Sequence, residues 1–140
     1  QFWVTDITYI PIPGSMLYMC AVLDLCGKAV LAWKIGADMS SSLVTDTIRE
    51  ALKREKVTGG LALHSDQGSQ YTSQAYFDLM HNAAMENFFG TLKTECLYRA
   101  HFTTRTEVEQ LVTEYVDFYN FERISLKNGL TPVEFRGKTV

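Results

Sequence analysis

The sequence lacks the features of a membrane-spanning, exported or disulfide-bonded protein. Its longest uninterrupted apolar run is only a few residues, far below the roughly 18 that span a bilayer, and no charged-then-apolar leader opens the chain. Its three cysteines are odd in number and show no CxxC spacing, which predicts buried free thiols rather than disulfides. We therefore expect a cytosolic protein.

An excess of positive charge is also missing. The net charge is −3 and the pI is about 5.6, which argues against a domain that holds nucleic acid by bulk electrostatic attraction alone. The acidic balance does not exclude chemistry on nucleic acid, because bound divalent cations offset the charge of clustered carboxylates.

What the chain does have is enough apolar sequence for one core. Its 140 residues are 46% hydrophobic, which predicts a single domain, and the strand-like opening at 1–3 predicts a fragment of a longer protein. Three β-rich runs separated by turns predict an antiparallel meander, and a fourth run after a helix should pair parallel to the first. The predicted strands are 2–10, 16–25, 29–35 and 61–65, and the helix begins with Ser41 or Ser42 as its cap and ends near Arg54.

The second half of the chain has helical patterning. From Ser73 to Cys96 only Gly90 interrupts the pattern. Thr104 and Glu107 have the spacing of a capping box, and they introduce a further helix with its apolar side chains on one face. Together with the four strands, this pattern predicts an α/β fold.

Three acidic residues lie in three separate contexts. Asp6 is inside the first predicted strand, Asp66 directly follows the fourth, and Glu86 lies in the helical stretch 82–89. A carboxylate in an apolar strand is costly to bury unless positive charge meets it, and divalent metal supplies that charge. The three are candidate ligands of two metal ions, with Asp6 bridging them and Asp66 and Glu86 each completing one, in a phosphodiester reaction.

Each carboxylate alone has an ordinary explanation, either a buried polar partner or solvation, but the surrounding motifs are specific. The segments WVTDITY (3–9), HSDQGSQYTS (64–73) and ENFFGTLKTE (86–95) closely resemble the catalytic core of bacterial insertion-sequence transposases of the retroviral-integrase type. The segment YNFER (119–123), followed by LTP (130–132), matches too. The resemblance covers essentially the whole chain.

The resemblance implies an RNase H-like fold, with a mixed sheet of about five strands, three antiparallel and then parallel, flanked by helices. It implies one catalytic core over 1–140, without the N-terminal DNA-binding region. Asp6, Asp66 and Glu86 would be the catalytic triad and would bind two Mg²⁺ or Mn²⁺ ions. The implied activity is nicking of a DNA 3′ end and strand transfer in transposition, with transposon ends and target DNA as partners. The active form would be a homo-oligomer in the bacterial cytoplasm, associated with the nucleoid.

Three polar residues near the triad are candidate DNA contacts. Lys93 follows Glu86 by seven residues, about two helical turns, so both project from one face; an ordinary surface lysine is an equally good interpretation. Asn87 and Gln70 are plausible DNA contacts, although helix and turn solvation explain them almost as well. Outside this group, we expect His64 to be a core histidine and Asp24 to make a turn hydrogen bond.

The interval between Asp66 and Glu86 is shorter than in the family, where it holds a further strand and a loop. We expect a missing segment, with a chain break between Met80 and Ala83, because losing an edge strand would expose apolar surface. A true deletion is the alternative, and it would favour a non-catalytic RNase H-like domain that binds DNA or oligomerises. A ribonuclease H or a Holliday-junction resolvase is a further alternative, which the motifs disfavour.

Overall fold

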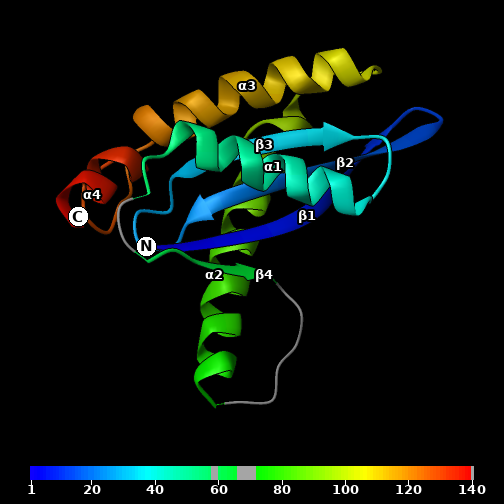
Figure 1. Ribbon diagram of the computed structural model, residues 1–140. Coiled ribbons are helices and arrows are strands. Elements are labelled where there is room, and N and C mark those ends of the chain that lie inside the picture. Colours follow the sequence, from blue (N-terminus) through cyan, green and yellow to red (C-terminus); the bar gives the residue numbers. More distant parts are fainter. Residues whose placement is uncertain (58–59, 66–71, 140) are drawn as a thin grey trace.

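The protein is described by a computed structural model that covers residues 1–57, 60–65 and 72–139 (Figure 1). Within these ranges no helix is long and apolar enough to cross a membrane. The elements are β1 (Phe2–Ile12), β2 (Ser15–Asp24), β3 (Val30–Gly36), α1 (Ser41–Arg54), β4 (Ala62–Ser65), α2 (Thr72–Glu95), the 3₁₀ helix η1 (Leu97–Arg99), α3 (Arg105–Phe121) and α4 (Pro132–Thr139).

The described strands form one mixed sheet in the order β3-β2-β1-β4. β1 pairs antiparallel with β2, and β2 with β3, while β4 pairs parallel with β1, so the meander and the crossover are confirmed. The sheet has four described strands, against about five in the predicted mixed sheet. The next described element after β4 is α2. The described part of the interval between Asp66 and Glu86 is therefore helical and contains no strand.

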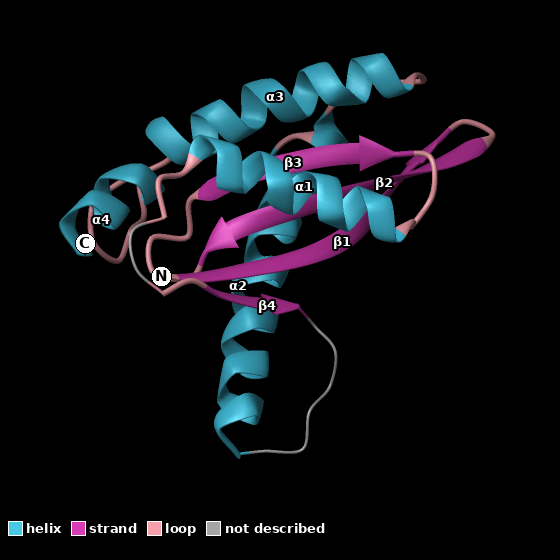
Figure 2. Ribbon diagram, in the orientation of Figure 1, coloured by secondary structure: helices cyan, strands magenta, loops and turns pink. Residues whose placement is uncertain are grey.

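Helices cover both faces of this sheet (Figure 2). α1 packs on one face, where Trp3, Val22 and Ala51 share a small apolar cluster. α2 and α3 pack on the other, where Val4 lies in the larger cluster with Phe88 of α2. Successive strand side chains point to opposite faces. Asp6 therefore shares the face of Val4, toward α2.

α2 is a single helix of 24 residues. Its residues Met85, Phe88 and Leu92 are fully buried at helical spacing and hold it against the sheet. α2 spans the residues between Met80 and Ala83, and the missing segment expected there stays a prediction.

Local signals placed most other boundaries to within one or two residues. The Thr104 hydroxyl accepts a hydrogen bond from the amide of Glu107 at 3.3 Å, which confirms the predicted capping box of α3. α1 is capped instead by Ser40, one residue before the predicted pair. The cysteines are free; burial raises the pKa of the Cys20 thiol, whereas Cys26 lies exposed in a turn and the prediction of its burial is wrong.

Candidate active site

Asp6 lies at the point where β1 loses one of its two described neighbours. β4 pairs with β1 only from Phe2 to Thr5, and Thr5 faces Ser65. Beyond that pair no described strand lies along this edge of β1. The half-buried Asp6 carboxylate accepts a hydrogen bond at 2.8 Å from the amide of Ile7, so this N–H is satisfied within the strand itself. In the described part of the chain, this side of the sheet therefore has an edge without a neighbouring strand, which we call the open edge, with a carboxylate at its start.

Two of the predicted site residues, Asp66 and Gln70, lie outside the described residues. Asp66 directly follows Ser65 in sequence, and the partner of Ser65 is Thr5, which directly precedes Asp6. A continued parallel register would bring Asp6 and Asp66 to neighbouring positions. Their proximity stays a prediction.

α2 lies along the same stretch of β1, held by contacts on both sides of Glu86. The fully buried His81 ring makes a hydrogen bond of 2.8 Å between Nε2 and the carbonyl oxygen of Thr5. Twelve residues further along, the Lys93 ammonium is 5.5 Å from the centre of the Tyr9 ring. Glu86, which is exposed, lies between these two contacts on the helix. The contact of His81 was not predicted, since nothing in the sequence around it indicated a partner in the first strand.

The helical repeat sorts the polar residues of α2 into two groups. At about 100° per residue, Asn82, Glu86 and Lys93 fall within about 40° of one another on one edge. Asn87 is exposed and lies about 100° further round the helix from Glu86. Glu86 and Lys93 therefore share an edge as expected, while Asn87 projects elsewhere, and the DNA contacts assigned to these residues stay predictions.

The donor atoms on this side of the sheet suit a hard divalent cation. Asp6 and Glu86 are carboxylates from different elements, and carboxylate oxygen is the ligand that Mg²⁺ and Mn²⁺ prefer. Within the described ranges no three histidine, cysteine or acidic side chains form a metal-binding group, and Asp66, the third predicted ligand, is not among those residues. Asp6 and Glu86 are therefore two of the three predicted metal ligands, and their role stays a prediction.

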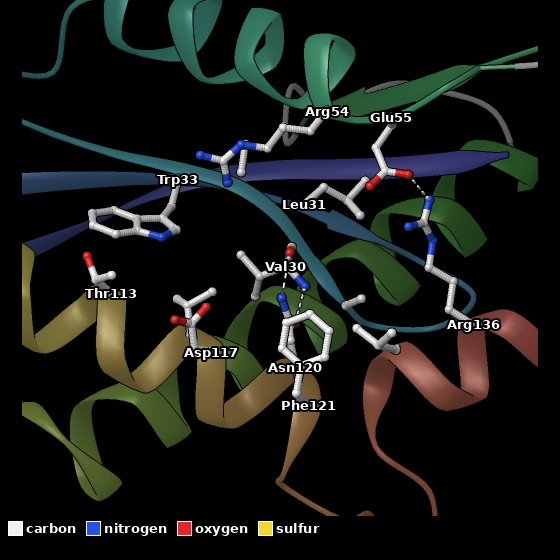
Figure 3. A pocket seen from close by; sticks show the side chains of 14 residues that line it. Val30, Leu31, Trp33, Arg54, Glu55, Thr113, Asp117, Asn120, Phe121 and Arg136 are labelled. Atoms are coloured by element: carbon white, nitrogen blue, oxygen red, sulfur yellow. Dashed lines mark hydrogen bonds and ion pairs between the residues drawn. The ribbon is translucent and has the colours of Figure 1, made fainter.

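The opposite edge of the sheet is closed by side chains of α3. Asn120 accepts a hydrogen bond from the amide of Val30 and donates one to its carbonyl oxygen, both at 2.8 Å (Figure 3). Arg105 donates to the carbonyl of Ile35 at 2.6 Å. Asn120 belongs to the YNFER segment (119–123), and its amide takes the place of a neighbouring strand at Val30.

A cavity of about 520 Å³ lies beside this closed edge, between β3, α1, α3 and α4. Trp33, Asp117 and Phe121 line it (Figure 3). At its rim Arg136 forms an ion pair with Glu55 at 2.6 Å. Arg136 also lies 3.6 Å from Asp24. The cavity is on β3 and has neither Asp6 nor Glu86 in its lining.

The end of α2 is fixed to α3 by a charged junction. Arg123 donates to both carboxylate oxygens of Glu95, with a shortest distance of 2.8 Å, and the Tyr115 hydroxyl donates to the same carboxylate at 2.8 Å. The hydrogen bonds of Arg123 hold the pKa of Glu95 below its usual value. Burial raises the pKa of Tyr115, and it raises that of Tyr119 to about 12. Arg123, a second member of the YNFER segment, therefore has a structural contact.

Asp24 has the turn role that the sequence predicted. Its carboxylate accepts a hydrogen bond at 2.8 Å from the amide of Gly27. A side chain at Gly27 would overlap Arg136, so glycine is required where α4 meets this turn.

Comparison with known proteins agrees with these observations. Two models of the integrase core domain match the chain, over residues 1–94 and 86–140. The putative transposase InsK of insertion sequence element IS150 from Escherichia coli (strain K12) is 36% identical over 154 residues, 98% of this chain and 54% of the relative. The transposase of IS904 from Lactococcus lactis subsp. lactis (strain IL1403) is 34% identical over 141 residues, 89% and 56% of the two chains.

Transposase InsF of insertion sequence IS3A from Escherichia coli (strain K12) is 32% identical over 158 residues, all of this chain and 55% of the relative. The match of 158 residues exceeds the 140 of this chain by 18, so the relative has additional residues within the matched region. The chain spans about half the length of these three curated relatives.

The fold has a counterpart among solved structures. A chain in the cryo-EM structure of the simian T-cell lymphotropic virus intasome in complex with PP2A regulatory subunit B56 gamma superposes with a TM-score of 0.72 at 15% identity, over 96% of this chain and 53% of that chain. This likeness establishes the predicted RNase H-like architecture. With matches to the integrase core domain over its whole length, the chain belongs to the integrase core family of insertion-sequence transposases.

Proposed function

We propose that this chain is a catalytic transposase core that nicks the 3′ ends of an insertion sequence and joins them to another phosphodiester. The observation that supports the proposal is that α2, which carries Glu86, contacts β1 at Thr5 through His81 and at Tyr9 through Lys93. Asp6 lies within that stretch of β1, on the face of the sheet toward α2. The two carboxylates thus come from neighbouring elements that are distant in sequence.

In this proposal Asp6, Asp66 and Glu86 hold two Mg²⁺ or Mn²⁺ ions. When bound, such ions activate the attacking oxygen and stabilise the leaving oxygen of a phosphodiester. Lys93 lies on the Glu86 edge and would bind a neighbouring phosphate as a point charge. Asn87 and Gln70 would make polar contacts with the same DNA from outside that edge.

Transposon ends and target DNA are the proposed partners. The net charge of −3 would repel a polyanion, so DNA affinity would depend on bound cations and on contacts such as Lys93. The names of the relatives and the intasome origin of the structural neighbour support a homo-oligomer as the active form. The place of action would be the bacterial cytoplasm, at the nucleoid.

A non-catalytic DNA-binding or oligomerisation domain is the second candidate. The uninterrupted α2 favours it, because an unbroken helix after β4 leaves less chain for the strand and loop of the family. The contacts of His81 and Lys93 favour catalysis, since they attach the helix that carries Glu86 to the strand that carries Asp6.

A DNA-joining assay distinguishes the catalytic candidate from the non-catalytic one. Its substrate is the DNA of the two ends of the insertion sequence that encodes the protein. Pre-nicked duplexes of those ends, incubated with Mg²⁺ or Mn²⁺, should be joined by the wild-type protein and not by Asp6→Asn or Glu86→Gln. A neutral amide has nearly the same shape as a carboxylate and is a poorer metal ligand, so DNA binding should survive.

Matched controls are available on other helices. Asp46→Asn on α1 and Glu114→Gln on α3 change exposed carboxylates of the same kinds, and both variants should join ends at the wild-type rate. If Asp6→Asn also joins ends at that rate while its melting temperature is unchanged, the non-catalytic candidate takes precedence.

A further inference from the structure

The Tyr9 side chain is an aromatic ring left largely exposed beside the candidate site. It is 57% exposed although it lies within β1. Its cross-strand partner is Tyr18 of β2, which is half-buried. Tyr9 follows Asp6 by three residues, about 10 Å along a strand, and because this separation is an odd number the two side chains leave β1 on opposite faces. The distance from the candidate ligand Asp6 is nonetheless within the span of a few nucleotides.

The side chain placed over this ring is Lys93. Its ammonium is 5.5 Å from the ring centre, and among the ion pairs of the described residues none includes Lys93. A positive charge held by a ring rather than by a carboxylate keeps its attraction for an incoming anion. Tyr9 and Lys93 together therefore offer a π-face next to a cation.

The edge of β1 beside this pair is poorly suited to a protein strand. Pro11 lies in β1 beyond Tyr9 and has no amide hydrogen to donate. At the other end of the open stretch the amide of Ile7 is already bonded to the Asp6 carboxylate. An added strand would find both positions unavailable, so the occupant of this edge should be recognised through side chains.

We propose that Tyr9 and Lys93 form a nucleotide-binding platform, on which Tyr9 stacks an unpaired base while Lys93 binds the adjacent phosphate of the same DNA strand. Aromatic stacking beside a cation is the combination with which proteins hold single strands without reading sequence. A base at a strand end is the easiest to unstack from its neighbours. The inference rests on the proposed function, because it is the bound strand that would pass from this platform to Asp6 and Glu86.

The two side chains should have separable effects on binding. For a short single-stranded oligonucleotide of mixed sequence, Tyr9→Ala should weaken binding roughly tenfold with an unchanged salt slope, because stacking carries no charge. Lys93→Ala should lower the slope of log K against log salt by about one. Tyr9→Phe should bind as the wild type does, since the ring is retained.

Photocross-linking identifies the stacked residue directly. The oligonucleotide would carry 5-iododeoxyuridine, and the cross-linked peptide would be sequenced by mass spectrometry. We expect the cross-link on Tyr9 in the wild type, at the same position in the Tyr9→Phe variant, and its loss in Tyr9→Ala. Tyr98→Ala, which removes a ring that is 74% exposed on η1, should keep the cross-link and the affinity. Cross-linking elsewhere together with wild-type affinity of Tyr9→Ala would overturn the inference.

Cleavage by Glu86→Gln, measured in parallel, keeps the two proposals distinguishable. If Tyr9→Ala binds normally and Glu86→Gln has lost metal-dependent cleavage, the platform is refuted and the proposed function stands. If Glu86→Gln cleaves at the wild-type rate, the proposed function is refuted. The platform proposal is then refuted as well, because it rests on that function.

Discussion

The two edges of the sheet are built in opposite ways. At β3 the exposed backbone is covered by side chains of α3, with Asn120 satisfying both polar groups of Val30 and Arg105 covering Ile35. At β1, beyond the short β4, no described strand covers the edge, which carries the Asp6 carboxylate and the exposed Tyr9 and contacts α2 through His81 and Lys93. The covered edge protects the fold from association, whereas the open edge leaves room for a ligand.

This difference divides the family motifs by role. The tail residues Asn120 and Arg123 form contacts that fix α3 to β3 and to the end of α2. Asp6 is half-buried and Glu86 is exposed, although their neighbours Thr5 and Met85 are buried. The family motifs thus have two roles. Residues of YNFER (119–123) stabilise the fold at the β3 edge, and we propose that Asp6 and Glu86 act in DNA cleavage and joining at the β1 edge.

Removing Asn120 should produce the largest loss of stability. Asn120→Leu leaves the buried N–H and C=O of Val30 without partners, which should lower the free energy of unfolding by about 2–5 kcal/mol. Urea denaturation measures this change. The matched variant Asn87→Ala, on an exposed position of α2, should stay within about 0.5 kcal/mol of the wild type. Equal effects of the two variants would show that the β3 edge does not depend on Asn120.

Replacing His81 should weaken the support of the open edge. His81→Leu removes the hydrogen bond to Thr5 in a buried environment and should cost about 1–3 kcal/mol of unfolding free energy. His81→Gln keeps a donor of similar reach and should recover part of that loss. An unchanged midpoint in urea for His81→Leu would mean that α2 is positioned by its apolar face alone.

The Glu95–Arg123 pair should contribute a smaller, pH-dependent amount. A double-mutant cycle with Glu95→Gln and Arg123→Ala should give a coupling of about 1 kcal/mol, since both side chains are about one-third exposed. The pKa of Glu95 is lowered from 4.5 in the folded chain, so its stabilisation is present above pH 4.5 and is lost as the pH falls through the folded value. Glu95→Gln should flatten this part of the stability profile, and an unaltered profile would refute the assignment.

Tyr9→Ala should have the smallest effect on stability. Its ring is exposed and its contact with Lys93 is a surface cation–π interaction, worth about 0.5 kcal/mol. Thermal denaturation should show a midpoint close to that of the wild type. A large decrease would mean that Tyr9 supports the β1–β2 hairpin.

Much of the fold followed from local patterns. The meander, α1 and the capping box at Thr104 each depend on neighbouring residues, and sequence predicts such features well. The parallel pairing of β4 with β1 joins residues 60 apart, and it followed from the rule that a strand after a crossover helix pairs parallel. The sequence did not predict that Asn120 would replace a strand at β3, because the partners are 90 residues apart. The contact of His81 with Thr5 spans 76 residues and escaped prediction for the same reason.

The candidate site was predicted in part. Helical spacing alone places Glu86 and Lys93 on one edge, and strand alternation places Asp6 on the face toward α2. What alternation does not give is the length of β4, whose end at Ser65 opens the edge of β1 next to Asp6. The helical patterning of 73–96 predicted α2, whereas the missing segment near its middle was inferred from the family pattern and stays a prediction.

Titration of Mn²⁺ into the ¹⁵N-labelled protein tests the difference between the two edges most directly. Paramagnetic broadening falls off steeply with distance, so the backbone amide signals of Ile7 and Glu86 should disappear first, while those of Val30 and Ile35 persist. Asp6→Asn should abolish this selective loss. Broadening centred on the β3 edge, or unchanged in Asp6→Asn, would contradict the assignment of the open edge as the metal-binding site.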